Sequence, residues 1–333
     1  MNHLSFYWLP DNQQLFIESL ETEFAELVEQ SINTGKISLP PISEVVLKIQ
    51  KLCSLESTGI SDIANCLLED PGLAAIVLKV ANSVIFNRGN VTCKDLNTAV
   101  SRLGILRVRD IVTAQSIELL KHSVNLTEEC KDVLVQSAAV SRELAATMVM
   151  VTQAFQDQAP TSYQYLEQEK ALLVGFLADI GLFCLVNEYH LYLEKGNYLD
   201  SNLAMQIFHS RCPITSEQVL KTWGFDNDFI EVASNQPKSL ERPEVSYLDI
   251  ARIANHVLLY RKQDHEALEE HEVEINVDGA EVLYKLTTMS DQEFKTKTSE
   301  VKLPPAKPEA YWMTPSKGLI LRPRRGSFTS LGL

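Results

Sequence analysis

Residues 175–181 read Gly-Phe-Leu-Ala-Asp-Ile-Gly, inside an apolar run that predicts a long, strongly apolar helix over about 164–188. Asp179 stands between Leu177 and Ile180, so the sequence places a carboxyl group among side chains typical of a core. A buried carboxylate without a partner costs several kcal/mol, which means that Asp179 must find one. We expect it to ligate a metal, to accept a hydrogen bond that orients a helix, or to lie exposed at a groove.

Helical periodicity continues outward from this stretch in both directions. Asp70-Pro71 is typical of a helix start, and Gly104 is typical of a helix stop. Small residues such as Ala145 favour close approach of neighbouring helices. No alternating run predicts a strand, and no fixed-period repeat predicts a solenoid. The sequence therefore predicts an all-α protein, with helices at about 13–33, from 42, 60–69, 70–85, 96–103, 105–121, 127–156, 164–188, 200–210, 214–223, 226–234 and 246–262.

The composition limits the function classes. The chain has 333 residues, 45% of them hydrophobic, which is enough to fill a substantial core. A formal net charge of −14 opposes nonspecific binding of nucleic acid, so we expect no nucleic-acid partner. The one basic cluster lies near the C-terminus, within an irregular region at 303–333 that favours a solvated tail, although Tyr311 and Trp312 could pin it to the body: Arg322, Arg324 and Arg325.

Six scattered cysteines include no C-x-x-C pair, which indicates reduced thiols rather than a zinc site. The first residues do not resemble a secretion signal, and we expect no window with the run of about 20 apolar residues that a bilayer span needs. We therefore expect a cytoplasmic protein that binds no membrane.

A scan for catalytic motifs finds no Walker loop, nucleophile elbow, dinucleotide fingerprint or H-E-x-x-H, so 175–181 is the remaining candidate. Ala81-Asn82-Ser83 closes a helix, where the Asn and Ser side chains can satisfy backbone groups. A structural bracket is the favoured interpretation of that motif, and a direct functional contact is the alternative.

Several motifs follow one another in a specific order along the chain: Leu39-Pro40-Pro41, Leu68-Glu69-Asp70-Pro71-Gly72-Leu73-Ala74, Leu78-Lys79-Val80-Ala81-Asn82-Ser83, Ala99-Val100-Ser101-Arg102-Leu103-Gly104, the 175–181 stretch, and Leu220-Lys221-Thr222-Trp223-Gly224. With these motifs the chain resembles the HDOD family of bacterial signalling domains over roughly 38–262. The resemblance implies a five-helix region at 38–122 packed on a degenerate HD-type helical region at 123–262. Residues 1–37 would be an N-terminal helical extension, and 263–333 a C-terminal extension and tail.

The family is related to metal-dependent phosphohydrolases, in which His and Asp side chains hold divalent metals that activate water. The resemblance implies that this chain has lost most of those ligands, because only Asp179 retains a ligand type. His256 and His209 could compensate by a register shift, but a lone His on a helix is more often satisfied or exposed. The implied relic positions, with no catalytic residue and no metal, are Gln136, Ala178, Asp179, Cys212, Gln236 and Asn255.

We therefore expect a non-catalytic regulatory module without a cofactor, which acts through protein partners in trans or through a small ligand. The alternative is a phosphohydrolase or cyclic-nucleotide phosphodiesterase with an atypical metal site. A third hypothesis is a nucleotide or other anion bound between the helices. The acidic balance and the absence of a phosphate cradle oppose this hypothesis, although Arg107 and Arg109 lie close together in the sequence.

Overall fold

The computed structural model describes residues 3, 13–37, 39–40, 42–87, 89, 91–123, 126–237, 244–271, 273 and 275–301. Every regular element within these ranges is a helix, which confirms the all-α prediction. The helices are α1 (Gln13–Leu20), α2 (Glu23–Asn33), α3 (Glu44–Cys53), α4 (Ile60–Leu67), α5 (Pro71–Ala81), α6 (Leu96–Leu103), α7 (Ile105–Ser123), α8 (Glu128–Gln158), α9 (Gln168–Leu177), α10 (Gly181–Glu194), α11 (Ser201–Thr222), α12 (Asn227–Ser234), α13 (Tyr247–Lys262), α14 (His265–Glu270), α15 (Val277–Thr288) and α16 (Asp291–Val301).

Local sequence signals explain several of the helix ends. The Asp70 side chain accepts hydrogen bonds from the amides of Gly72 and Leu73, so the predicted cap of α5 is confirmed. Gly104 has a φ of 84°, which favours glycine, and it ends α6 as predicted. The Asn82 amide group donates to the carbonyl of Cys93 and accepts from its N–H, so the Ala81-Asn82-Ser83 motif is a structural bracket.

Four predicted helix boundaries were wrong. The helix predicted at 13–33 is divided because Thr22 caps a new helix, α2. The helix opened by Asp70 ends at Ala81 rather than near residue 85, where the Asn82 bracket stops it. The helices predicted on either side of Pro213 are one helix, α11, which continues through the proline. The run predicted at 164–188 is interrupted by a turn at 178–180.

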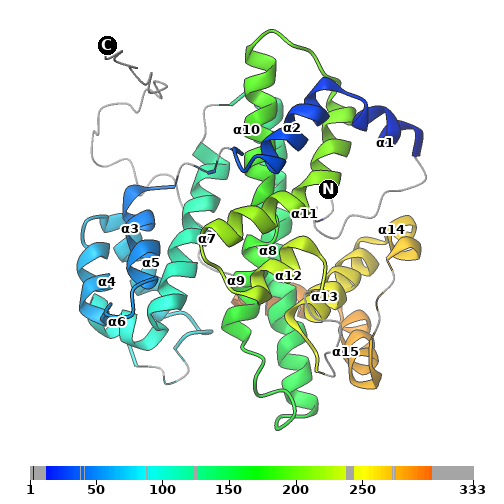
Figure 1. Cartoon of the computed structure of the whole chain (residues 1–333). Coiled ribbons are helices and arrows are strands. Elements are labelled where there is room, and N and C mark those ends of the chain that lie inside the picture. The colour runs from blue at the N-terminus through cyan, green and yellow to red at the C-terminus, as the bar shows by residue number, and fades with distance from the viewer. Residues whose placement is uncertain are drawn as a thin grey trace, which may run out of the picture.

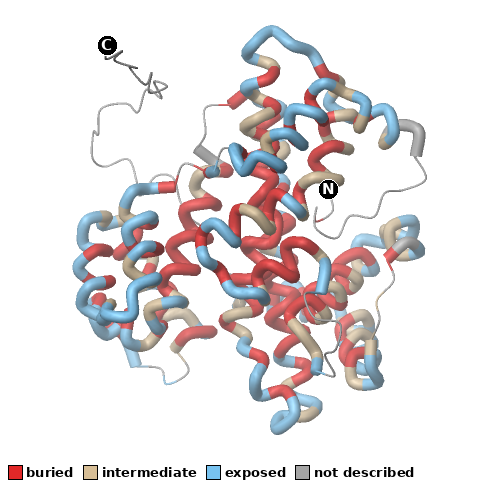
Figure 2. Tube along the Cα trace, viewed as in Figure 1, coloured by how far each residue is buried: buried red, intermediate tan, exposed pale blue. Residues whose placement is uncertain are grey.

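The helices are arranged around α8, α9 and α10. Helices α3 to α6 form a group on one side, and α7 lies between this group and α8 and α9 (Figure 1). This agrees with the predicted five-helix region packed on a second helical region. On another side, α13, α15 and α16 pack against α8, so the described part of 263–333 is a covering layer (Figure 1). Figure 2 shows that the buried positions concentrate in the central helices.

The glycines at both ends of the 175–181 stretch allow two close helix contacts. A Cβ atom on Gly175 would lie 2.7 Å from the Cα of Ala145 on α8, which confirms the predicted close approach of that alanine. A Cβ atom on Gly181 would lie 2.4 Å from the backbone nitrogen of Ser216 on α11. The stretch is therefore held from both sides by neighbouring backbones.

Two helical stretches are long and apolar enough to span a membrane, so the expectation of no such window was wrong. They are Glu128–Gln158 and Gln168–Glu194, with mean hydropathies of 1.2 and 1.8 in their most apolar windows. Of those windows, 61% and 89% is buried inside the protein. Helices that form the centre of a helical core have this composition.

Candidate functional site

The turn at 178–180 controls the orientation of Asp179. Hydrogen bonds join the N–H of Ile180 to the carbonyl of Leu177 at 3.2 Å, and the N–H of Leu182 to the carbonyl of Asp179 at 3.0 Å. These are i to i+3 bonds, which wind the backbone more tightly than an α-helix does. The tight turn separates α9 from α10, and the Asp179 side chain within it is only 2% exposed.

The Asp179 carboxylate is paired inside the protein. The Lys121 ammonium, on α7, donates to its two oxygens at 3.0 and 3.2 Å. The Ser137 hydroxyl, on α8, donates to Oδ2 and accepts from the Lys121 Nζ at 2.8 Å. All three side chains are buried, so they form a closed cluster that joins α7, α8 and the α9–α10 turn.

The charge on Asp179 is maintained by its neighbours. Burial by itself raises the pKa of a carboxyl group, but the Lys121 ammonium counteracts this effect, and His3 and the Ser137 hydroxyl act in the same direction as Lys121. As a result the pKa of Asp179 lies below its ordinary value. At neutral pH the cluster is therefore a buried ion pair, in which one carboxylate faces one ammonium group.

The backbone of the same turn is held by α11. The Gly181 N–H donates to the Ser216 hydroxyl at 2.9 Å, and the Cys212 sulfur lies 3.9 Å from the Asp179 carbonyl oxygen. Burial, with Asp179 nearby, raises the pKa of the Cys212 thiol to about 12. Cys212 is therefore a protonated thiol that packs and donates weakly, rather than a thiolate ligand.

The structure brings together only some of the predicted relic positions. Ala178 and Cys212 are buried beside Asp179. Gln136 and Gln236 are exposed, so they do not belong to the buried surroundings of Asp179. Asn255 is buried on α13, but in the described part of the chain no hydrogen bond joins it to Asp179, and its Nδ2 has none.

His256 and His209, the two histidines that could have replaced the lost ligands, do not form a metal site with Asp179 in the described ranges. The ring of His256 lies 5.7 Å from that of His271, measured between centroids, and burial lowers the pKa of His256. Burial also lowers the pKa of His209, to about 4. Both rings therefore favour the neutral form inside the protein.

Sequence reasoning missed the residues that pair with Asp179. Lys121 follows Ala114 and Ile117 at helical spacing, so a lysine on an apolar stripe was a readable sign of a buried partner. Ser137 lies one residue beyond Gln136, on the buried stripe of α8 that also contains Leu134 and Ser141. No periodic pattern around His3 indicated that this side chain would lie near Asp179.

The HD-type site implies a divalent metal, and the residues around Asp179 do not fit one. Such a metal needs several carboxylate or imidazole donors, whereas Ala178 offers none and Cys212 stays protonated. The Lys121 ammonium occupies the position beside the carboxylate that a cation would take. Within the ranges that the structure describes, no group of three or more His, Cys, Asp or Glu could hold a metal ion.

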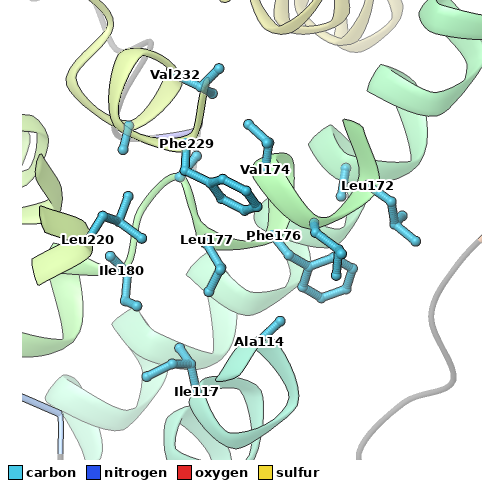
Figure 3. Close-up of a cluster of buried hydrophobic side chains, with 14 of the residues drawn as sticks. Ala114, Ile117, Leu172, Val174, Phe176, Leu177, Ile180, Leu220, Phe229 and Val232 are labelled. Carbon is cyan, nitrogen blue, oxygen red and sulfur yellow. The ribbon is translucent and has the colours of Figure 1, made fainter. Parts of the chain in front are cut away.

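The surroundings of the turn are a packed core. Figure 3 shows Leu177 and Ile180 among apolar side chains contributed by α7, α9, α11 and α12. Leu177, Ile180 and Leu220 have no measurable exposure. The segment thus connects the cluster around Asp179 to the main core, and the labelled neighbours are Ala114, Ile117, Leu172, Val174, Phe176, Leu220, Phe229 and Val232.

The family can now be assigned. The sequence profile of the HDOD domain matches residues 39–239, which is more than half of the chain. The chain belongs to the HDOD family. The match begins within one residue of the start that the motifs indicated, and it ends before α13. The HDOD match therefore contains Lys121, Ser137 and the whole 175–181 stretch.

Solved structures share the fold of this HDOD chain. A protein named "Putative metal-dependent phosphohydrolase" from Shewanella amazonensis SB2B matches with a TM-score of 0.63 and 22% identity, over 83% of this chain and 98% of the other. A "Putative phosphohydrolase" from the same organism matches with a TM-score of 0.50 and 17% identity, over 84% and 99%. An HDOD domain protein of unknown function from Geobacter sulfurreducens has 16% identity and a TM-score of 0.46, over 84% and 98%.

The two Shewanella structures show the fold and not the chemistry, because their identities to this chain are only 22% and 17%. No protein with a curated description matches the sequence significantly. The function of this HDOD chain must therefore be argued from its own residues.

Proposed function

We propose that this HDOD chain is a non-catalytic regulatory module of bacterial signal transduction, which acts by binding other molecules through its helical surfaces. The observation that carries the proposal is the buried ion pair between Lys121 and Asp179. In the HD-type scheme this aspartate would ligate a metal, but here its charge is matched by an ammonium group. The Ser137 hydroxyl completes the cluster, so the retained aspartate serves the fold.

A groove of about 580 Å³ is a candidate binding surface of the module; α6 and α7 line one side, and α9 and Asp226 line the other. Its charged side chains are already paired: Arg107 with Glu167, and Lys170 with Asp226 at 3.0 Å. Nearby, Arg109 pairs with Asp110 and donates to the Gly224 carbonyl. A nucleotide or phosphate would have to displace these acidic partners, which favours a protein partner over an anion at this groove.

The enzymatic alternative is tested by hydrolysis of bis(4-nitrophenyl) phosphate and of a cyclic dinucleotide, with Mn²⁺, Fe²⁺, Mg²⁺ or Ni²⁺ supplied in turn. We expect the rate with each metal to equal the rate in EDTA and in a protein-free blank, because the donors around Asp179 cannot hold the ion that would activate water. Turnover that depends on a metal and is lost in EDTA would establish the alternative.

The binding proposal has a separate test, affinity capture of partners from the source cell at the native concentration of the chain. It expects a specific partner that an unrelated helical protein of similar charge does not recover. Capture of nothing beyond that control would contradict the proposed mode of action, whatever the hydrolysis assay gives.

A further inference from the structure

A second groove lies between the C-terminal part of α8 and helix α15, and none of its lining residues belongs to the cluster around Asp179. This groove has a volume of about 670 Å³, and it is lined by residues of both helices. A smaller cavity of about 180 Å³ shares Ala154, Asp157 and Lys285 with it and extends to Val301, the last described residue. The two form one continuous depression that begins where the described chain ends.

The outer side of α15 is unusually apolar for a surface. Val277 and Tyr284 are 76% and 72% exposed, and Ala280 lies between them at helical spacing. The opposite side of α15 buries Val282 and Leu286 in the core. Helix α15 thus has two apolar faces, and the outer face meets nothing in the described part of the chain that covers it.

The chain itself supplies a segment with the matching chemistry. Residues 302–333 contain six Lys and Arg but a single acidic residue, Glu309, in a chain whose net charge is −14. They also contain the cluster Tyr311-Trp312-Met313, whose large side chains suit an apolar groove. The groove is lined by two acidic residues, Asp157 and Glu281, and by one cation, Lys285, which pairs with Asp157 at 3.5 Å. The lining therefore keeps a net negative charge, which can attract a basic segment.

The length of the linker also fits. Nine residues lie between Val301 and Tyr311, and an extended chain that covers these ten steps reaches about 33 Å. Helix α15, with its 12 residues, is about 18 Å long at 1.5 Å per residue. Pro304, Pro305 and Pro308 favour an extended linker. Tyr311-Trp312-Met313 can therefore reach any point of the groove while the chain remains attached at Val301.

We propose that Tyr311-Trp312-Met313 dock into the α8–α15 groove of the same chain, so that the C-terminal segment is an internal ligand of this surface. The proposal is independent of the cluster around Asp179 and of whether the chain is an enzyme. A displaceable internal ligand would let a partner compete for the outer face of α15.

Tryptophan fluorescence of the full chain tests this proposal. The chain has three tryptophans, Trp8, Trp223 and Trp312, and subtracting the spectrum of Trp312→Phe from that of the unmodified chain isolates Trp312. We expect a blue-shifted emission that is several-fold less accessible to acrylamide than free tryptophan. Tyr284→Lys should restore full accessibility, because a positive charge in the groove repels the basic segment, whereas Tyr198→Lys, at another site that is 83% exposed, should change nothing.

Three results would overturn the proposal. Trp312 could be fully accessible in the unmodified chain, which would mean that no docking occurs. Trp312 could be protected to the same degree in Tyr284→Lys, which would place the segment elsewhere. Its protection could disappear on dilution, which would identify a second copy as the source of the segment.

Discussion

Replacement of Lys121 by Met is expected to lower the free energy of unfolding by about 3–5 kcal/mol, because it leaves the Asp179 carboxylate buried without a counter-charge. The change keeps most of the side-chain volume, so the loss comes from the missing charge and hydrogen bonds. Equilibrium denaturation in urea measures the effect. Lys131→Met is the matched control: Lys131 pairs with Glu128 on the surface, and its loss should cost less than about 0.5 kcal/mol.

A second substitution distinguishes the two possible causes of the stability loss in Lys121→Met, the unpaired charge and the altered packing. Asp179→Asn, added to Lys121→Met, should recover at least half of the lost stability, since the amide is neutral and can still accept from Ser137. A double variant that is less stable than Lys121→Met alone would show that the ion pair is not the source of the effect.

The stability of the Lys121→Met variant should also depend on pH differently from that of the unmodified chain. Without the ammonium, burial raises the pKa of Asp179 above its unfolded value, so the native variant binds a proton more readily than the unfolded chain. The stability gap between the unmodified chain and the variant should therefore narrow as the pH falls from 7 toward the ordinary carboxyl pKa of about 3.9. A gap that is independent of pH in this window would contradict the assignment.

Gly181→Ala is expected to destabilise the chain by about 3 kcal/mol or more, at or above the upper end of overpacking costs. The added Cβ would lie 2.4 Å from the backbone nitrogen of Ser216 and 2.8 Å from its hydroxyl oxygen. Because the obstacle is backbone, α10 must move away from α11, which disturbs the turn that presents Asp179. Thermal and urea unfolding measure the loss.

Gly89→Ala provides the control for this substitution. A Cβ atom at Gly89 would meet nothing within 4 Å, so this change should leave the stability within about 0.5 kcal/mol. If Gly89→Ala and Gly181→Ala lowered the stability equally, the close contact between α10 and α11 would not be the reason for the loss at Gly181.

The sequence predicted the fold well where the signals are local. The Asp70 cap, the Gly104 stop and the close approach of Ala145 depend on residues near in sequence or on side-chain size, and the structure confirms them. The division of the 164–188 run was missed because the turn at 178–180 depends on contacts with α7 and α11, which periodicity does not reveal.

The site was less predictable because it joins distant residues. Lys121 and Asp179 are 58 residues apart, and nothing in either local pattern names the other as its partner. On α8, the family motifs pointed to Gln136 as the relic ligand position, whereas the buried stripe of this helix contains Ser137. Following the apolar period through Leu134 and Ser141 leads to Ser137, one position after Gln136.

The central claim is that the Lys121 ammonium, and not a divalent metal, balances Asp179. Elemental analysis tests it most directly, on chain purified without chelators from cells grown with added Fe, Mn and Ni, after gel filtration. The account predicts metal contents far below one ion per chain. One or two ions of a single metal per chain, retained through gel filtration, would contradict it.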